Sequence, residues 1–534
     1  MRPDTSIQHP VSSLHLKIRI LRFLYTIFAS VFSGVLLFLA FPRYDLGFLA
    51  WVGLVPLLLS MRGKGPKEGF SLSWTCGLVF FAGAFSWIYQ VPGYNSIHHA
   101  LIIPYLGLYF AVFGLGFSLI SKRWGIVVAL WAAPFLWVSL EYLRSTLGFL
   151  SLPWALLGHS QYRYPPIIQV ASFTGAYGIS FLIVLVNAAL AAVLLNCLGR
   201  LRAYRHLAAS VVVTFALVGF VLSYGYMILG KSLPAKTIRI SVVQANVDQE
   251  MKNNPKKYAK PIMQKHVDLT HKVAQDNPRL IVWPEGATPG FVLKNMSLLN
   301  QIRSLVREKG AYFVIGSSEY PKFIKEASYG PQEFGNTAIF FSPGGKVLGQ
   351  YLKIRLVPFG EYIPLEKTVP WPRFIVPDEK KSFEVPGNEF TLFQLDGTRF
   401  GVLICWEIVF PDLCRGFAKK GANFMINITN EGWFGESAAP YQMAAINVFR
   451  AVENRIAVAR AANTGISCFI DPFGRITGKV RNSGKDSFVE GYLTQEIVLA
   501  DENTFYTRHG DLFVYAILLV SVLIVGASLI VRMR

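Results

Sequence analysis

The sequence predicts a polytopic α-helical membrane domain of eight transmembrane helices, joined to one α/β domain outside the membrane. Length is the first reason, because 534 residues exceed the size of one ordinary domain. Composition is the second, because 52% hydrophobic and 16% charged residues make the chain too apolar for two soluble domains. The third is distribution: apolar segments fill residues 1–230 and 512–534, whereas residues 231–511 alternate strand-like and helix-like stretches.

Eight segments are apolar and nearly free of charge over the roughly 20 residues that a helix needs to cross a bilayer. They lie at roughly 23–41, 46–61, 69–90, 100–121, 125–142, 172–196, 207–229 and 513–531. The segments at 46–61 and 125–142 are marginal in length. Basic residues precede the first segment as in a secretory signal, but no small-x-small cleavage site follows, so we expect a retained anchor.

The net charge of +20 comes mainly from the membrane part. Residues 231–511 hold 35 Lys and Arg against 28 Asp and Glu, whereas the rest of the chain holds 17 against 4. With eight spans and a cytoplasmic start, 14 of those 17 basic residues fall on one side, as the positive-inside rule predicts. We therefore expect both termini in the cytoplasm, residues 231–511 on the opposite side, and no binding of nucleic acid.

Residues 231–511 are expected to form mixed α/β structure around a buried sheet, because β-branched runs alternate with helical patterns. The expected strands are Thr237 to Gln244, Leu280 to Trp283, Tyr312 to Gly316, Thr337 to Ser342, Phe400 to Cys405, Asn423 to Asn427 and Ile466 to Ile470. The expected helices are Ala259 to Gln275, Met296 to Lys309, Leu413 to Lys420 and Tyr441 to Ala459. The Gly344-Gly345 turn predicts a hairpin, so the sheet is not purely parallel.

Three of the five cysteines lie in this domain: Cys405, Cys414 and Cys468. Their number is odd and no CxxC pair occurs, so we expect at least one unpaired thiol, no structural disulfide framework and no metal site.

Cys405 is a candidate nucleophile, because it ends an apolar, strand-like run. A thiol attacks as its thiolate and therefore needs a base or a positive neighbour. Histidine is the usual partner, but the three histidines of this domain lie outside strand-end motifs. Glu285 is the better candidate for the base, because it follows another strand and an apolar pocket raises the proton affinity of a carboxylate.

Lys353 is a cation among apolar neighbours and can hold the oxyanion of a tetrahedral intermediate, a contact worth about 3–4 kcal/mol. Each of the three residues alone also has a structural explanation. Cys405 can be a small buried hydrophobe, Glu285 a cap or turn residue, and Lys353 a cation that extends to solvent. Together, each beside its own strand of one domain, they favour a catalytic site.

Glu, Lys and Cys in this order resemble the triad of the nitrilase superfamily, which makes or breaks bonds to acyl carbons. A domain of that kind between seven spans and one closing span is similar to the apolipoprotein N-acyltransferase family, over essentially the whole chain. Further motifs of the family stand at 242–246 (VVQAN), 283–285 (WPE), 335–337 (GNT), 358–364 (PFGEYIP), 405–407 (CWE), 430–435 (NEGWFG) and 462–465 (ANTG). The runs PFGEYIP and WFG are the specific ones.

The resemblance implies an αββα nitrilase-like sandwich with Glu285 as general base, Lys353 as oxyanion partner and Cys405 as acylated nucleophile. It also implies that Glu361 supports the base and that Glu407 is needed for turnover. The structural alternatives are a turn residue for Glu361 and a charge at a helix N-terminus for Glu407. Candidate lid or substrate-binding residues are Trp371, Phe374, Trp433, Phe434 and Asn336. The apolar loop 369–377 is either a buried connector or a lid that dips into lipid headgroups.

The implied reaction moves a fatty acyl group from a membrane phospholipid, through a Cys405 thioester, to the α-amino group of the N-terminal diacylglyceryl-cysteine of an apolipoprotein. This ping-pong exchange is the last step of lipoprotein maturation. The implied partners are the phospholipid, the modified apolipoprotein and the bilayer, with a monomeric enzyme and no cofactor. The implied location is the bacterial inner membrane with a periplasmic catalytic domain, divided as 1–230, 231–511 and 512–534.

Three residues depart from the family pattern, and none belongs to the triad. Trp406 stands where relatives often have Tyr, Asn253 where Trp is expected, and Met443 where many have His. Two other function classes stay open: a membrane-anchored amidase, and a transporter or scaffold with an inactive nitrilase-like module. Almost no ionisable residue except Glu141 lies within the spans, which argues against a transport path.

Overall fold

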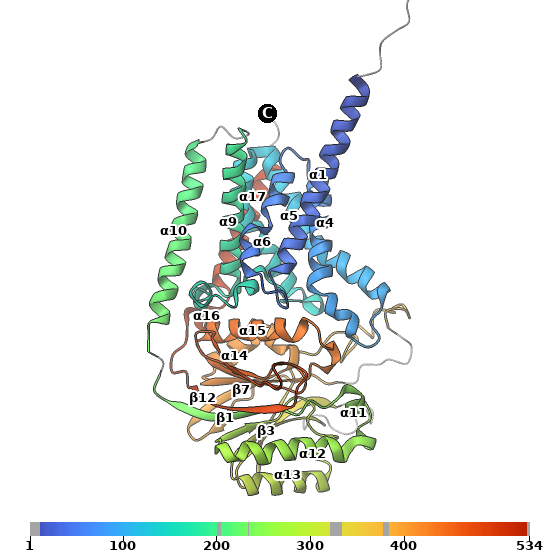
Figure 1. The fold of residues 1–534 in the computed structure, drawn as a ribbon, viewed down its shortest axis with the longest axis vertical. Helices are drawn as coiled ribbons and strands as arrows, with labels where there is room; N and C mark the ends of the chain where they lie inside the picture. Colours follow the sequence, from blue (N-terminus) through green and yellow to red (C-terminus); the bar gives the residue numbers. More distant parts are fainter. Residues whose placement is uncertain (1–10, 200–203, 233, 321–333, 377–383, 531–534) are drawn as a thin grey trace, which may run out of the picture.

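The computed structural model describes residues 11–199, 204–232, 234–320, 334–376 and 384–530. It consists of a bundle of helices above an α/β domain (Figure 1). Six of the described helices are long and apolar enough to cross a membrane. Their bounds are Val11–Leu39 (α1), Ser96–Trp124 (α5), Ile126–Thr146 (α6), Ala176–Cys197 (α9), Tyr204–Leu229 (α10) and Leu512–Ile530 (α17). They coincide with six of the eight predicted spans.

The predicted span at 46–61 differs, because it is broken into the short helices Gly47–Leu49, Ala50–Gly53 (α2) and Val55–Ser60 (α3). Pro56 lies in the first turn of α3 and lacks the N–H that would continue the helix. Asn187 on α9 caps the break: its side chain accepts a hydrogen bond from Leu54 N at 2.8 Å and donates one to Ala50 O at 2.9 Å.

The predicted span at 69–90 also differs in its bounds. It is the helix Pro66–Ala84 (α4), followed by a 3₁₀ turn at Ser86–Gln90. Charged residues Lys67 and Glu68 lie in its first turn. Because α4 and the pair α2–α3 fall outside the six helices that meet the length and hydropathy requirement, the count of eight spans stays a prediction.

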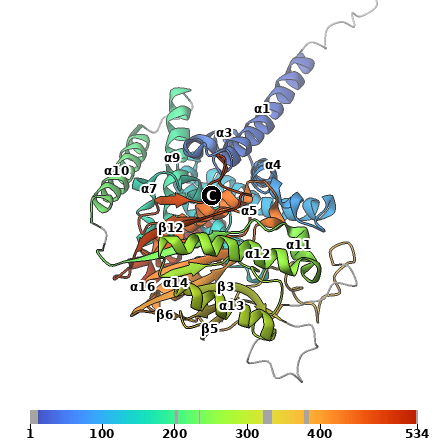
Figure 2. The ribbon, with the colours of Figure 1, turned by 60° about the horizontal axis from the view of Figure 1, so that its bottom comes forward.

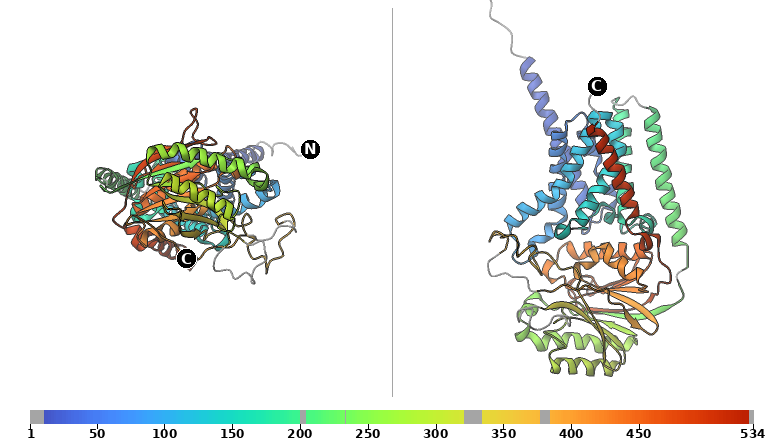
Figure 3. Two further views of the ribbon diagram at one scale, coloured as in Figure 1. Left: turned by 90° about the horizontal axis from the view of Figure 1, so that it is seen from below. Right: turned by 180° about the vertical axis from the view of Figure 1, so that it is seen from behind.

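The bundle has a clear orientation relative to the α/β domain. The start of α1 and the end of α17 both lie at the end of the bundle far from that domain (Figure 1). Helix α17 packs against α5 and α6 at the back of the bundle (Figure 3). Helix α10 stands at the edge, where it contacts α9 and the short helix Pro165–Ile168 (α7). Only 22% of the apolar stretch of this helix is buried against the rest of the protein, so most of its surface can face lipid.

The α/β domain contains two six-stranded sheets, ordered β12-β1-β2-β3-β4-β5 and β11-β10-β9-β8-β7-β6. The first sheet comprises Thr237–Gln244 (β1), Leu280–Val282 (β2), Tyr312–Glu319 (β3), Gly335–Phe341 (β4), Val347–Leu352 (β5) and Gly491–Val498 (β12). The second comprises Phe393–Leu395 (β6), Thr398–Ile404 (β7), Phe424–Thr429 (β8), Ala457–Ala462 (β9), Cys468–Ile470 (β10) and Ile476–Lys479 (β11). The hairpin predicted at Gly344-Gly345 is confirmed, because it joins the antiparallel strands β4 and β5.

Helices cover the outer face of each sheet. The helices of this domain are Gln249–Asn253 (α11), Pro255–Val273 (α12), Met296–Lys309 (α13), Pro411–Lys419 (α14), Ala439–Asn454 (α15) and Phe505–His509 (α16). Helices α12 and α13 pack on the first sheet at the end of the molecule farthest from the bundle (Figures 1 and 2). The inner faces of the two sheets meet in one core, where the rings of Phe340 and Phe400 lie 5.2 Å apart.

Strand β9 was missed, because residues 457–459 were predicted as the end of a helix. Helix α15 ends at Asn454, and Arg455 adopts a left-handed conformation with φ 51° that stops the helix. The alanine-rich run 457–462 has a helical composition but is fully buried between β8 and β10. Tertiary pairing outweighs local propensity at this position.

Helix α15 joins the α/β domain to the bundle. All of its residues except Tyr441 are buried, and it lies between the second sheet and the membrane helices (Figure 1). The Gln442 side chain accepts hydrogen bonds from Trp87 Nε1 and Trp154 Nε1, and it donates to Pro42 O and Ala84 O. Four hydrogen bonds from one buried amide fix the domain on the bundle.

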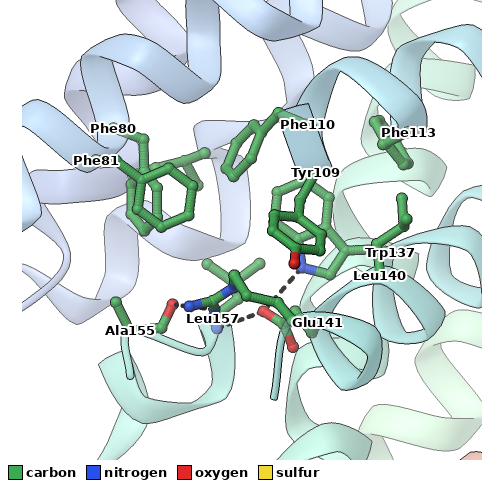
Figure 4. Close-up of a pocket in the computed structure, with 12 residues that line it drawn as sticks. Phe80, Phe81, Tyr109, Phe110, Phe113, Trp137, Leu140, Glu141, Ala155 and Leu157 are labelled. Atoms are coloured by element: carbon green, nitrogen blue, oxygen red, sulfur yellow. Dashed lines mark hydrogen bonds between the residues drawn. The ribbon is translucent and has the colours of Figure 1, made fainter. Parts of the chain in front are cut away.

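A cavity of about 20 Å³ lies inside the bundle and has room for about one water molecule (Figure 4). Glu141 and Arg144 line it. Glu141 Oε1 accepts hydrogen bonds from Trp137 Nε1 at 3.0 Å and Leu157 N at 2.7 Å. Arg144 donates to carbonyl oxygens in the segment 152–155. Both side chains therefore hold the segment 152–157, whose Trp154 contacts Gln442 of the α/β domain, rather than lining an open path.

Candidate active site

Glu285, Lys353 and Cys405 follow three different strands, β2, β5 and β7, and meet between the two sheets. All three are buried, with exposed fractions of 8%, 0% and 7%. Lys353 Nζ lies 3.8 Å from Glu285 Oε1. Cys405 is close enough for the charges of Glu285 and Lys353 to change its pKa. The structure therefore brings the three predicted residues into one site.

Hydrogen bonds hold both carboxylate oxygens of Glu285. Oε1 accepts from Asn336 Nδ2 at 2.6 Å, and Oε2 accepts from the backbone N of Asn430 at 2.6 Å. Gly316 on β3 makes room for this turn, because a Cβ atom there would lie 2.3 Å from Pro284 O and 2.7 Å from Glu285 Cα. The carboxylate is thus fixed in direction, with a hydrogen-bond donor on each oxygen.

Lys353 is held between carboxylates. Its Nζ donates to Glu361 Oε1 at 2.5 Å, and its backbone N donates to Asn336 O at 2.9 Å. Burial lowers the pKa of Lys353, but the surrounding negative charges, with Glu361 first and Glu285 also contributing, outweigh burial and raise it well above the ordinary value. The ammonium group therefore stays charged at neutral pH and can face a developing oxyanion.

Cys405 is the first residue after β7 and has a left-handed backbone conformation, with φ 56°. Such a conformation is uncommon for a residue with a side chain, and it turns the chain sharply at the strand end. Burial raises the pKa of the thiol, the Glu285 charge raises it further, and the Lys353 charge lowers it. The resting group is therefore a thiol that needs a base.

All five cysteines are free, which confirms the expectation of an unpaired thiol in this domain. Burial also raises the pKa of Cys414 to about 12 and that of Cys468 to about 11.

Glu407 connects the chain at Lys353 to the chain at Cys405. Its carboxylate accepts hydrogen bonds from the backbone N of Ile354 at 2.7 Å, of Arg355 at 3.0 Å and of Ile404 at 2.8 Å, and from the Tyr351 hydroxyl at 3.0 Å. Burial raises the pKa of Glu407 to about 7 against these donors. Glu407 lies in the first turn of the 3₁₀ helix Cys405–Val409, as the structural alternative expects, and its bond from Ile404 N caps that helix. Its bonds from Ile354 N and Arg355 N also join this strand end to the chain that follows Lys353.

Glu361 lies in the site, as the motif PFGEYIP predicts. Besides Lys353 Nζ, it accepts a hydrogen bond from Val357 N at 2.8 Å through Oε2. Glu384 lies beside it, and Oε2 of Glu384 is buried with no hydrogen-bond partner among the described residues. Burial and the Glu361 charge raise the pKa of Glu384 to about 8.

The predicted lid residues lie in different surroundings. Trp371 donates to Pro364 O at 2.6 Å and packs edge-on against Phe359, whereas Phe374 is 51% exposed. Trp433 is 40% exposed, but the Phe434 ring contacts Trp87 of the bundle at 5.0 Å. Phe434 therefore belongs to the contact between the two parts of the molecule. The last residue of the predicted lid loop, 377, lies outside the described residues.

The three departures from the family pattern have local partners. Trp406 Nε1 donates to Arg355 O at 2.8 Å, and its ring packs against Phe410. Asn253 accepts from Gln249 Nε2 at 2.9 Å, and Met443 is fully buried. None of these hydrogen bonds or ring contacts involves the triad.

Sequence reasoning missed several residues of the site. Lys252 donates to Glu285 O at 3.0 Å, and burial lowers its pKa to about 8. Asn427 on β8 donates to Cys405 O at 3.3 Å. A polar residue inside the apolar run FMINIT was a usable signal for Asn427. Lys252 and Glu384 carried no such signal, because they lie in polar stretches far from the triad in sequence.

Comparison with known proteins agrees with this architecture. The family model described as apolipoprotein N-acyltransferase N-terminal domain matches residues 33–189, and that described as carbon-nitrogen hydrolase matches residues 239–504. The apolipoprotein N-acyltransferase of Geobacter metallireducens is 36% identical over 498 residues, which cover 91% of this chain and 92% of the relative. That of Chlorobaculum tepidum is 30% identical, covering 91% of this chain and 93% of the relative.

Among solved structures, an amidase of the nitrilase superfamily from Nesterenkonia AN1 is 20% identical. The match covers 54% of this chain and 99% of the amidase, with a TM-score of 0.38. The family assignment comes from the two domain matches and from the curated relatives, which agree along nearly the whole length. The chain belongs to the apolipoprotein N-acyltransferase family.

Proposed function

We propose that Cys405, Glu285 and Lys353 carry out transfer of a fatty acyl group from a membrane phospholipid to the α-amino group of a diacylglyceryl-cysteine at the N-terminus of an apolipoprotein. The observation that carries this proposal is the buried thiol beside an anchored carboxylate and a charged lysine. Membership of an acyltransferase family supplies the reaction class.

In the first step, Glu285 accepts the thiol proton and the Cys405 sulfur attacks the ester carbonyl of the phospholipid. The carbonyl oxygen becomes an oxyanion that the Lys353 ammonium stabilises. The carbon–oxygen bond to glycerol then breaks, and Glu285 returns its proton to the departing alkoxide. The products are an acyl thioester on Cys405 and a lysophospholipid.

In the second step, the α-amino group of the acceptor attacks the thioester carbonyl. Glu285 takes a proton from the amine, and the carbon–sulfur bond breaks to release the Cys405 thiolate, which regains a proton. Asn336 and the backbone N of Asn430 keep Glu285 aimed at the reacting atoms through both steps. Glu361 keeps Lys353 in place, and Glu407 holds the two strand ends together.

Exclusion of water favours transfer over hydrolysis, because a thioester open to solvent is lost to water. We assign this role to the lid candidates, Trp371 and Phe374 in the loop that follows Glu361, and Trp433 and Phe434 in the turn that follows Asn430. The contact of Phe434 with Trp87 ties the turn that carries Trp433 and Phe434 to the bundle. A site held against the bundle also restricts the search for two lipid-anchored substrates to the membrane surface.

The topology that we propose places the α/β domain in the periplasm and both termini in the cytoplasm of a bacterial inner membrane. Five of the six long apolar helices precede the α/β domain, an odd number of crossings. Counting α2–α3 and α4 as two further crossings gives the predicted eight spans and leaves that number odd. Positive-inside bias then assigns the basic ends of the helices to the cytoplasm. Domains at 1–230, 231–511 and 512–534 and a monomeric enzyme complete the proposal.

The two other function classes find less support in the geometry. The buried charges of the bundle, Glu141 and Arg144, hydrogen-bond to nearby backbone, as expected for structural residues. A transport path would instead need them to line an aqueous route. A membrane-anchored amidase shares the triad and differs in what attacks the thioester, so it is separated by product analysis.

The test is a two-substrate assay with purified full-length protein in phospholipid vesicles and a synthetic diacylglyceryl-cysteine peptide. We expect N-acylated peptide and lysophospholipid in equal amounts. The variant Cys405→Ala should insert and melt like wild type and form neither product. Release of free fatty acid in place of acylated peptide would identify a hydrolase and overturn the proposal.

A further inference from the structure

Arg460 on β9 lies directly behind the active site and is fully buried, without touching the triad. Its guanidinium group donates one hydrogen bond from each of its two terminal nitrogens. Nη1 donates to Asn427 Oδ1 at 2.6 Å, and Nη2 donates to Glu431 Oε1 at 2.5 Å. Glu431 is also fully buried, so the two charges form an ion pair removed from water.

The hydrogen bond from Nη1 connects Arg460, through Asn427, to the nucleophile Cys405. Arginine only donates hydrogen bonds, so Asn427 must turn its oxygen to Arg460 and its amino group to β7. Asn427 Nδ2 then donates to Leu403 O at 3.0 Å and to Cys405 O at 3.3 Å. Arg460, with a longer hydrogen bond from Asn447 Nδ2 to the same oxygen at 3.4 Å, thus sets the orientation of the amide that holds the strained backbone at Cys405.

The hydrogen bond from Nη2 connects Arg460, through Glu431 and Asn430, to the base Glu285. Glu431 follows Asn430, whose backbone N donates to Glu285 Oε2 at 2.6 Å. The Glu431 carboxylate is fixed by Arg460 and accepts a hydrogen bond from Ile466 N at 3.3 Å. Gly465 is required for this packing, because a Cβ atom there would lie 1.5 Å from Glu431 Oε2.

Stability alone is a weak reason to keep such a pair, because well-packed apolar residues of similar volume often replace buried ion pairs at no cost. Apolar residues would not orient an amide on one side and a peptide N–H on the other. We propose that Arg460 is a positioning residue that aligns Cys405 with Glu285, through Asn427 and Glu431, for the acylation step. This inference rests on the proposed thioester chemistry.

The experiment compares Arg460→Met, Glu431→Met and the double variant in full-length protein. Each single variant leaves one buried partner uncompensated and should lower the melting temperature, whereas the double variant should recover most of it. We expect the double variant to form the Cys405 thioester about 100-fold more slowly at saturating phospholipid, as for a misaligned site. The phospholipid concentration at half-maximal rate should stay within about twofold of wild type, because no lipid contact is lost.

The pair Arg450 and Glu453 on α15 provides a matched control, because it is equally buried and its ion pair measures 2.8 Å. The double variant Arg450→Met, Glu453→Met removes the same charges and should keep the thioester rate within about threefold of wild type. A rate for Arg460→Met, Glu431→Met within that same range would overturn the inference, since the pair would then serve folding alone.

A second variant keeps the test decisive if the double variant does not fold. Arg460→Lys retains the charge but presents one nitrogen to two partners, so it should melt near wild type and acylate at least about tenfold more slowly. A wild-type rate in Arg460→Lys would contradict the proposal that Arg460 must bond Asn427 and Glu431 at the same time. Failure of the proposed function is distinguishable, because wild type itself would then form no thioester.

Discussion

Replacement of Lys353 by Met tests the electrostatics of the site. Lys353 Nζ lies 2.5 Å from Glu361 Oε1 and 3.8 Å from Glu285 Oε1 and is inaccessible to solvent. Methionine has a similar length and removes the charge. Two effects follow and must be separated: loss of oxyanion stabilisation, and loss of the cation that compensates two buried carboxylates.

Because Lys353 is buried and paired, the loss of transition-state stabilisation and the loss of folding free energy can both be given a magnitude. Removing one oxyanion donor costs about 3–4 kcal/mol in the transition state, or about 100- to 1,000-fold in rate. Breaking a buried ion pair by removing one partner costs about 3–5 kcal/mol of folding free energy. The double variant Lys353→Met, Glu361→Gln removes one uncompensated carboxylate, so it should recover much of the stability and none of the rate.

The assay is quenched-flow measurement of acyl-thioester formation from labelled phospholipid, with thermal unfolding and vesicle binding measured on the same preparations. We expect a large loss of rate, with lipid binding nearly unchanged, in both variants. Recovery of the rate in the double variant to within about fivefold of wild type would show that Lys353 only compensates Glu361. Equal losses in rate and lipid binding would instead identify Lys353 as a headgroup contact.

Three further predictions concern the base and the thiol. Gly316→Ala should displace Glu285 and slow thioester formation by about 10- to 100-fold, whereas Gly290→Ala, with open space where the added Cβ would lie, should not. Burial and the Glu285 charge raise the pKa of Cys405, so alkylation by iodoacetamide should rise only as pH increases beyond the ordinary thiol value of about 8.5. Glu285→Gln removes a negative charge that raises this pKa, so the alkylation curve should move to lower pH while acylation is lost; a shift to higher pH would contradict this electrostatic account.

Most elements of the α/β domain were predictable, because their sequence period matches their burial. Helix α13 has the predicted bounds, Met296–Lys309, and strand β1 has the predicted bounds, Thr237–Gln244. Short or weakly patterned strands were not predicted. Strand β12, Gly491–Val498, is mostly half-exposed and carries several polar residues, so only its antiparallel pairing with β1 makes it a strand.

The membrane part was predictable where apolar length alone decides, as in α5 and α9. The segment 46–61 was not, because Pro56 and the side chain of Asn187, 137 residues from Ala50, determine how its helix breaks. Contacts of this kind depend on packing between distant segments, which no local pattern encodes.

In the site, too, some features follow from local sequence patterns and others depend on contacts between distant segments. Glu285, Lys353 and Cys405 stand in strand-end motifs, so their convergence was predictable once the two-sheet sandwich implied by the family resemblance was assumed. Lys252 comes from the short helix α11 and Glu384 from a loop, and only the fold brings them to the triad. Glu407 was anticipated as a needed residue, but its hydrogen bonds to both strand ends required coordinates.

The central claim is that one thiol carries the acyl group. Mass spectrometry of peptides from wild-type protein, incubated with phospholipid of known chain length and no acceptor, tests it most directly. We expect an added mass equal to that acyl chain on the peptide containing Cys405, removed by neutral hydroxylamine. The same mass on Cys414 or Cys468, or an unmodified protein beside lysophospholipid and free fatty acid, would contradict it.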